Sequence, residues 1–188
     1  MKHADPVQKV SIISRGSAGG YTLAVPQEDK TLHSRNYFYD QLAMLLGGYA
    51  SEKLVFNDLT TGPSSDLERA TQMARSMVTR YGMSPLGART FGKKEEMVFL
   101  GKEMHEEKNY SEKTAEDIDV AVSTLIENAL NTATTILTEK RALLDTLAQA
   151  LLKEENIEKE RFDAIMRGEG AARAGAGRAI RPGCADGG

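Results

Sequence analysis

The chain has 188 residues, of which 40% are hydrophobic and 27% charged, and its net charge is −3. This composition is typical of a globular domain with a real core, and the slightly acidic balance argues against a general nucleic-acid binder, which needs a basic surface. Cys184 is the only cysteine, so an intramolecular disulfide is excluded, which fits a reducing compartment without requiring one. No bilayer-spanning apolar run or signal peptide is present, so the chain as given is expected to be soluble.

The first thirty residues are predicted to form β-structure. The runs VQKVSII (7–13) and GYTLAV (20–25) are rich in strand-forming residues, and SRGSAGG between them supplies glycines for a turn. We therefore expect a hairpin or two neighbouring strands. An edge strand here would have free backbone N–H and C=O groups, with which an extended peptide could pair.

A helix is predicted from about residue 34, where Ser34 could cap it. Apolar and aromatic residues recur at helical spacing after it, at Phe38, Leu42, Leu45, Leu46 and Tyr49. Gly47 and Gly48 lie inside this pattern. They are either a weak point that costs about 1 kcal/mol each or a place where another backbone approaches closely. We favour close approach, because the apolar pattern continues on both sides.

A second amphipathic helix is predicted to start at Ser65, which has capping-box spacing to Glu68, and to end at Gly82. Its apolar face consists of Leu67, Ala70, Ala74, Met77, Val78 and Tyr81. Asp66 lies in the first turn beside this face. The simple interpretation is an acid that faces the positive end of the helix dipole. The alternative is a partly buried carboxylate that needs a partner, and a metal ion is one such partner.

Residues 83–110 are expected to be irregular apart from a short strand at MVFLG (97–101). A long helix is predicted from about Ser111 to Leu137 and another over residues 141–155, and the short break between them favours a helical hairpin. A short closing helix is predicted at 158–166. From Arg167 the chain is mostly Gly, Ala and Arg, so residues 167–188 are predicted to be a disordered tail. The expected fold is mainly α, with a small N-terminal β-element and a C-terminal helical hairpin.

Several familiar catalytic motifs are absent from the sequence. It contains no G-x-x-x-x-G-K-[ST] phosphate loop and no G-x-S-x-G elbow, and one cysteine cannot build a thiolate metal site. The segment HEEKN (105–109) begins like the zinc-binding H-E-x-x-H helix, but Asn109 stands in place of the second histidine. Its surroundings are polar and acidic, so we interpret this match as a coincidence.

Six blocks of the chain, in this order and spacing, resemble the peptidase domain of the FtsH-type ATP-dependent zinc metalloproteases. The resemblance extends over about residues 3–166, so residues 1–166 are identified as a helical metallopeptidase domain. The blocks are HADPVQKVSII (3–13), GGYTLAVPQEDK (19–30), LAMLLGGYASEKLVF (42–56), TTGPSSDLERATQMARSMVTRYGMS (60–84), RTFGKKEEMVFLGKE (89–103) and NYSEKTAEDIDVAV (109–122).

The resemblance implies roles for particular residues. The family binds zinc through the two histidines of an H-E-x-x-H helix and a later aspartate in the DLERAT block, which is Asp66 here. The strand that contains Gly20, Tyr21 and Thr22 resembles the one that borders the family's substrate cleft. The glycine pair at 47–48 matches the family's Leu-Leu-Gly-Gly helix, which is expected to pack close to the metal helix.

The chain also departs from the family's pattern. The H-E-x-x-H helix, with the general-base glutamate, would lie directly upstream of Met1, as would the ATPase module and the membrane anchors, so no catalytic residue is expected within this chain. Tyr49 stands where the family usually has arginine. Without the metal helix, apolar faces around Leu45 to Gly48 are expected to be exposed, and the chain alone is predicted to be inactive.

The implied parent protein is a homo-hexameric zinc metalloendopeptidase that uses ATP, bound by the upstream module, to degrade unfolded or membrane polypeptides. It would work at the cytoplasmic side of the inner or plasma membrane. A different class of function also remains open: the chain could be a non-catalytic helical assembly module, or a decayed homologue, that docks into protease rings.

Overall fold

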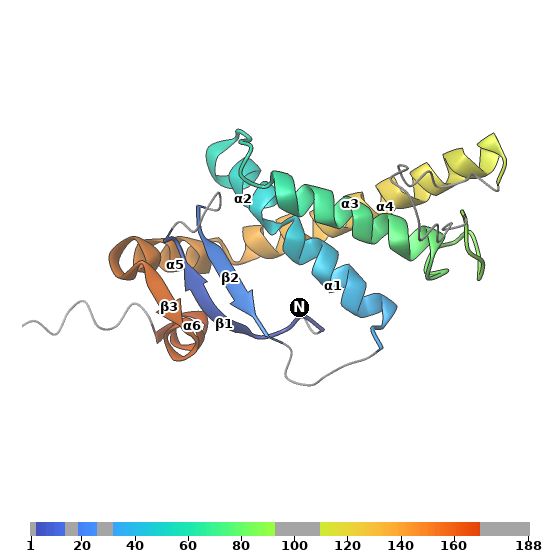
Figure 1. The fold of residues 1–188 in the computed structure, drawn as a ribbon. Helices are drawn as coiled ribbons and strands as arrows, with labels where there is room; N and C mark the ends of the chain where they lie inside the picture. Colours follow the sequence, from blue (N-terminus) through green and yellow to red (C-terminus); the bar gives the residue numbers. More distant parts are fainter. Residues whose placement is uncertain (1–2, 14–18, 26–31, 93–109, 170–188) are drawn as a thin grey trace, which may run out of the picture. The chain divides into compact units, whose positions relative to one another are not determined.

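The computed structural model describes residues 3–13, 19–25, 32–92 and 110–169 (Figure 1). The described parts of residues 1–6 and 26–140 form one compact unit, and the described parts of residues 7–25 and 141–188 form another. The first unit is helical, and the second contains a three-stranded antiparallel sheet with two helices. The prediction of a mainly helical protein with a small β-element is confirmed.

The helical unit consists of α1 (Arg35–Leu45), α2 (Gly47–Phe56), α3 (Ser64–Thr79) and α4 (Glu112–Glu139). α4 packs against the other three helices, and α1 also packs against α3. Side-chain caps fix where two of the helices begin. The Ser34 hydroxyl accepts the Tyr37 N–H at 3.2 Å, as predicted, and the Ser111 hydroxyl accepts the Thr114 N–H at 3.2 Å.

The core of this unit follows the predicted apolar stripes. Small residues dominate it, which lets the helix axes approach closely. Its buried members are Leu42, Ala43, Leu45, Leu46, Ala50, Ala70, Ala74, Met77, Ala129 and Ala133. Leu45 is only 6% exposed and Leu46 only 1%. The expectation that these leucines would be uncovered is therefore wrong, because the helices of this chain already cover them.

The region around Gly47 and Gly48 differs from the prediction in two ways. The chain forms two helices here rather than one, because α1 ends at Leu45 and α2 begins at Gly47. The turn loses few hydrogen bonds, since the Leu46 N–H still donates to Leu42 O and the Ala50 N–H donates to Leu46 O, each at 3.0 Å.

As the second difference, no backbone among the described residues approaches these glycines closely, whereas their packing against a metal helix outside this chain stays a prediction. A Cβ on Gly47 would meet nothing within 4 Å. A Cβ on Gly48 would lie 3.8 Å from Cβ of Pro63, which is an ordinary van der Waals contact.

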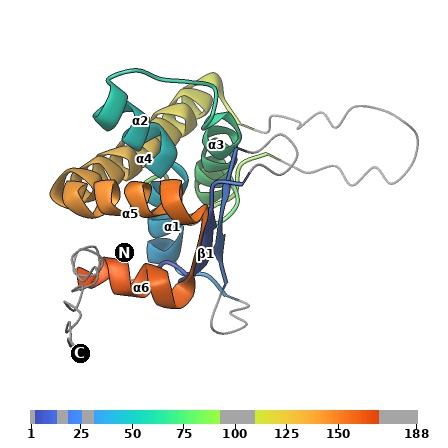
Figure 2. The same cartoon turned by 90° about the vertical axis from the view of Figure 1, so that its left-hand side faces the viewer.

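The second unit consists of β1 (Val7–Ser11), β2 (Tyr21–Ala24), α5 (Arg141–Glu154), β3 (Asn156–Glu158) and α6 (Lys159–Met166) (Figure 2). Its strand order is β2-β1-β3, and both pairings are antiparallel. Val10 of β1 lies opposite Thr22 on one side and Ile157 on the other. Ile157 is fully buried and forms a small core with Ala150 and Ile165. The predicted strands at 7–13 and 20–25 are confirmed with shorter bounds, whereas β3 was not predicted.

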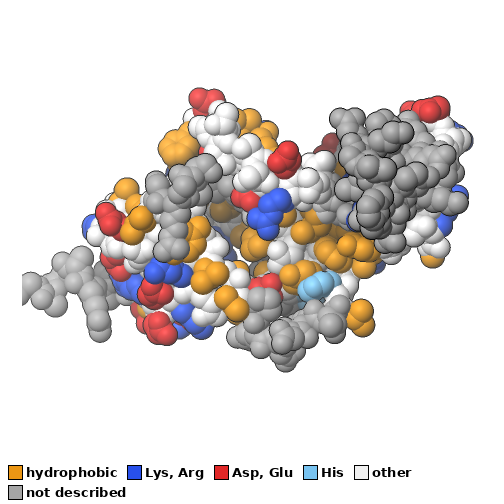
Figure 3. All heavy atoms as spheres, in the orientation of Figure 1, with side chains coloured by type: hydrophobic (Ala, Val, Ile, Leu, Met, Phe, Trp, Pro, Cys, Tyr) orange, Lys and Arg blue, Asp and Glu red, His pale blue; other side chains and the backbone are white. Residues whose placement is uncertain are grey.

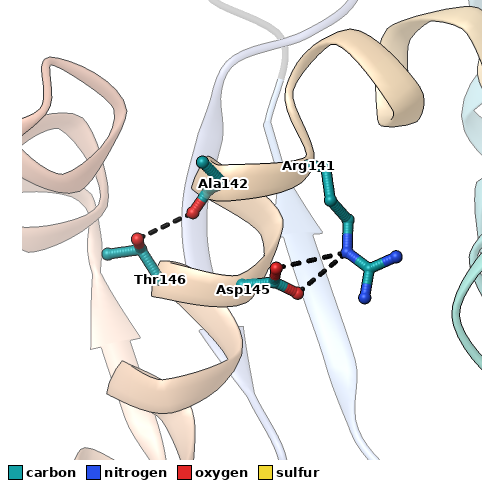
Figure 4. A network of polar contacts seen from close by, with 4 residues as sticks. All are labelled: Arg141, Ala142, Asp145 and Thr146. Atoms are coloured by element: carbon teal, nitrogen blue, oxygen red, sulfur yellow. Dashed lines mark hydrogen bonds and ion pairs between the residues drawn. The ribbon is translucent and has the colours of Figure 1, made fainter.

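α5 and α6 confirm the two helices predicted after residue 140. Figure 4 shows how the first turns of α5 are stabilised. Arg141 Nε lies 3.0 and 3.2 Å from the two carboxylate oxygens of Asp145, and the Thr146 hydroxyl donates to Ala142 O at 2.8 Å. The helical hairpin of α4 and α5 stays a prediction, because the two helices belong to different units.

Two further predictions fall largely on residues that the structure does not describe. The short strand at 97–101 lies wholly outside the described residues, and so does the predicted tail from residue 170 onward. Within the described part, α6 ends at Met166, and Arg167 pairs with Glu169 at 2.8 Å.

Candidate metal centre

A short turn places Asp66 at the start of α3. The Ser64 N–H donates to Thr61 O at 3.2 Å, and the Leu67 N–H donates to Pro63 O at 2.9 Å. Pro63 is buried, so the turn is fixed to the body of the helical unit at the point where the helix begins. The first helical turn, with Asp66, follows directly from this anchored proline.

The predicted capping box of Ser65 and Glu68 is wrong. α3 begins at Ser64, its N-cap residue is Pro63, and no side chain caps it. Because Pro63 already supplies the first carbonyl acceptor, Ser65 lies inside the first helical turn. A residue in that position cannot act as the N-cap.

Asp66 has the half-buried position that its place beside the apolar face predicted. Its side chain is 44% exposed, and Oδ1 lies 3.7 Å from a guanidinium nitrogen of Arg69. Ala70 and Met77, on the same side of the helix, are fully buried. An exposed ion pair of this length contributes little to stability, so the carboxylate keeps the capacity to bind another cation.

The other candidate zinc ligands do not gather around Asp66. Among the residues that the structure describes, no three His, Cys, Asp or Glu side chains come together as a metal site requires. His33 instead stacks on Tyr37 with ring centroids 4.4 Å apart. The HEEKN segment lies outside the described residues. Catalytic zinc uses three protein ligands and keeps one position open, so the described side chains do not by themselves fit a zinc ion.

The segment that precedes β1 is tied to α1. The His3 backbone N–H donates to Asp40 Oδ2 at 2.7 Å, and the Tyr37 hydroxyl donates to Asp5 Oδ2 at 3.2 Å. Partial burial raises the pKa of Tyr37 above its usual value, and the charge and hydrogen bond of Asp5 raise this pKa further. The start of the described chain is therefore held against the first helix of the helical unit.

Aromatic side chains extend this contact region along α1. Phe38 stacks on Tyr81, which follows the end of α3, with ring centroids 5.4 Å apart. The prediction that Tyr81 belongs to the helix face is wrong, since α3 ends at Thr79 and Tyr81 is 51% exposed. Figure 3 shows hydrophobic side chains gathered at the surface over α1, with a histidine at their edge.

Of the three residues predicted to contact substrate, Tyr21 and Thr22 begin β2, and Gly20 directly precedes it. Tyr21 pairs with Ser11 and Thr22 with Val10. In the described sheet β2 has β1 as its one neighbour, so it forms an edge. Gly20 makes the pairing possible, because a Cβ at this position would lie 2.6 Å from Ser11 O. Only glycine allows the two backbones to approach so closely.

Comparison with known proteins identifies the family. Residues 1–165 match the profile of peptidase family M41. The chain belongs to peptidase family M41. The M41 match covers the helical unit, the strands and the helices that follow, so the resemblance seen in the six sequence blocks is confirmed.

Relatives of this M41 chain carry closely similar names. The chain is 46% identical over 166 residues to ATP-dependent zinc metalloprotease FtsH 1 of Sphaerobacter thermophilus, covering 88% of this chain and 25% of that protein. It is 46% identical over 169 residues to the FtsH 1 of Conexibacter woesei, covering 89% and 26%. It is 47% identical over 168 residues to the FtsH of Chloroflexus aggregans, covering 87% and 26%.

The M41 chain thus spans about a quarter of the length of these relatives. In the described part of the chain, none of the helices has the length and apolar character needed to cross a membrane.

The sequence analysis did not predict the pairing of Asp66 with Arg69, although the spacing of three residues on a helix would have indicated it.

Proposed function

We propose that this chain is the C-terminal part of an ATP-dependent zinc metalloendopeptidase that degrades unfolded or membrane polypeptides, and that Asp66 is one of its three protein zinc ligands. Membership of family M41 and the half-exposed carboxylate of Asp66 at the start of α3 support this. The remaining ligands and the general-base glutamate would come from an H-E-x-x-H helix outside these 188 residues. When bound, zinc would polarise the scissile carbonyl and lower the pKa of a bound water.

Asp66 is chemically suited to this role. A carboxylate oxygen is an established zinc ligand, and the first turn of a helix holds it in a defined direction. Its contact with Arg69 is long, at 3.7 Å, so a divalent cation could replace it at small cost. The buried neighbours Ala70 and Met77 would keep the ligand side of the helix apolar.

We assign substrate binding to the edge of β2. An extended peptide would add to this edge through backbone hydrogen bonds, which tolerate many sequences. Tyr21 and Thr22 would lie beside the bound peptide, and Gly20 would keep the strand close to β1. Such a mode fits a protease that accepts unfolded chains with little sequence preference.

The parent's assembly and location belong to the same proposal. The names of the relatives describe ATP-dependent enzymes, and the matched residues make up only about a quarter of each, so the ATPase would lie in the additional sequence. We expect a homo-hexamer at the cytoplasmic side of the inner or plasma membrane.

One observation favours the alternative of a non-catalytic assembly module or a decayed homologue. The helical core buries Leu45 and Leu46 with the chain's own helices, while the described residues contain no cluster of three metal-ligating side chains. A stand-alone module would need a core that its own helices cover, and it would not need a complete metal site.

The deciding experiment uses a longer protein in which this chain follows an H-E-x-x-H segment and an ATPase module. Asp66→Asn should weaken zinc binding by more than the about 10- to 100-fold typical of losing an outer-sphere partner, and casein degradation should fall with it. Asp58→Asn is the matched control, because the Asp58 carboxylate accepts only the neighbouring Leu59 N–H, at 2.8 Å, in the contacts described. If both variants kept full zinc content and activity, Asp66 would be only an acid facing the helix dipole.

A further inference from the structure

A surface cavity of about 410 Å³ lies between α1, the turn that follows α3 and the N-terminal half of α4. Cavities of this size commonly accept a ligand or a side chain of a partner. Val120 of α4 lines the cavity and is 61% exposed, so a large apolar side chain stays accessible there. The apolar members of the lining are Met83, Pro85, Leu86, Val120, Ala121 and Leu125.

A second hollow over α4 continues this surface, because Val120 and Thr124 line both. Its lining is acidic. All of its lining residues lie on the described helix α4, and none of them is Lys or Arg. Spacings of three and four residues place its acids on one face of the helix. These acids are Glu112, Glu116, Asp119 and Glu127.

Helix stability does not explain the acids of this face. Like charges three or four residues apart destabilise a helix, and Glu116 has such a neighbour on each side, Glu112 and Asp119. The helix dipole favours acids only in the first turn, so it does not account for Asp119 or Glu127. In the part of the chain that the structure describes, Glu116, Asp119 and Glu127 form no ion pair, so their charges are open to a partner.

The two hollows together carry a negative charge. Among their lining residues the one cation is Arg35, whose guanidinium carbon lies 5.9 Å from the centre of the Tyr39 ring on α1. Asp117 of the cavity and the four acids of the second hollow make five carboxylates against this one guanidinium. A partner that covers this surface must carry positive charge, because a carboxylate that loses water needs a counter-charge. A second copy of this chain is less suited, since each copy has a net charge of −3.

We propose that this surface of α4 docks a peptide segment of a partner protein in which a large apolar side chain is flanked by Lys or Arg. The apolar side chain would fill the cavity beside Val120, and the flanking cations would face Glu116 and Asp119. Complementary charge would select such a segment over neutral or acidic ones. This docking needs no metal and does not depend on the proposed function.

The first part of the test measures binding to the 188-residue chain by fluorescence anisotropy. The probe is a short labelled peptide in which every third residue is leucine and the others are lysine. At low salt it should bind at least about tenfold more tightly than the same peptide with glutamate for lysine or with serine for leucine, and added salt should weaken it. Equal binding of the three peptides, or no binding of the first, would overturn the proposal.

The second part uses variants of the chain. Glu116→Gln/Asp119→Asn should weaken binding of the lysine-leucine peptide about fivefold or more, as loss of two ion pairs does. Glu68→Gln/Asp58→Asn is the matched control, because it removes the same two charges from α3 and the loop before it, and it should change binding less than about twofold. If the two double variants bound the peptide equally well, the acids of α4 would not be its site, and the proposal would be wrong.

The third part locates the bound peptide by methyl chemical shifts. Addition of the lysine-leucine peptide should shift the methyl resonances of Leu86, Val120 and Leu125 and leave those of Val55 unchanged, since Val55 lies on α2 and outside the cavity. Unmoved methyl resonances at Val120 would overturn the proposal. So would shifts of these resonances with chain concentration in the absence of peptide, because the surface would then join two copies of the chain.

Discussion

Gly20 shows how one residue sets the spacing of the small sheet. A Cβ added there would lie 2.6 Å from the carbonyl oxygen of Ser11, and the obstacle is backbone that cannot rotate away. We expect Gly20→Ala to destabilise the protein by about 1–3 kcal/mol, the usual cost of forced overpacking. Denaturant unfolding measures this difference.

Gly19→Ala provides the matched control for that substitution. A Cβ on Gly19 would meet nothing within 4 Å, so its effect should stay within about 0.5 kcal/mol. Equal stability of the two variants would show that β2 does not approach β1 as closely as described.

Sequence alone predicted part of the environment of Asp66 and missed the rest. Helical periodicity placed it beside Ala70 and Met77, and this half-buried position is confirmed. The contact between Glu52 and Thr60 could not be predicted in the same way. These residues are eight positions apart, and their hydrogen bond depends on how the connection between α2 and α3 folds back, which no periodic pattern indicates.

Helix starts provide a prediction at the level of secondary structure. The hydroxyls of Ser34 and Ser111 accept N–H groups of α1 and α4, whereas α3 has no side-chain cap. Ser34→Ala and Ser111→Ala should each cost about 1 kcal/mol of unfolding free energy. Ser65→Ala should cost much less, since Ser65 lies inside the first turn of α3. If Ser65→Ala lowered the free energy of unfolding as much as Ser34→Ala does, Ser65 would cap α3 as first predicted.

The elements that sequence reasoning missed are those fixed by contacts distant in the chain. β3 has only three residues between two helices, and it is a strand because Ile157 pairs with Val10 and fills the core of its unit. The break between α1 and α2 was hidden because both helices continue one apolar pattern. By contrast, the sequence predicted the apolar face of α4 and the strands near the N-terminus, because their periodicity is local.

At the scale of the whole molecule, the helical unit covers its own core. Leu46 is 1% exposed and contributes to the cluster shared by α1, α2, α3 and α4. Leu46→Ala should therefore lower the free energy of unfolding by about 2–5 kcal/mol. It should also speed amide hydrogen exchange in all of these helices.

Met44→Ala is the control for this core substitution. Met44 lies two residues away on α1 and is 41% exposed, so we expect a much smaller loss of stability. Leu46→Ala with unchanged exchange in α2 and α4 would mean that these helices do not share one core.

The most direct test of Asp66 as a zinc ligand is a crystal structure of the longer, zinc-bound protein, with anomalous diffraction recorded at the zinc absorption edge. The proposed function predicts an anomalous peak about 2.0–2.2 Å from a carboxylate oxygen of Asp66, with the 3.7 Å contact to Arg69 replaced by the metal. A fully coordinated zinc ion with Asp66 still paired to Arg69 would contradict the proposal.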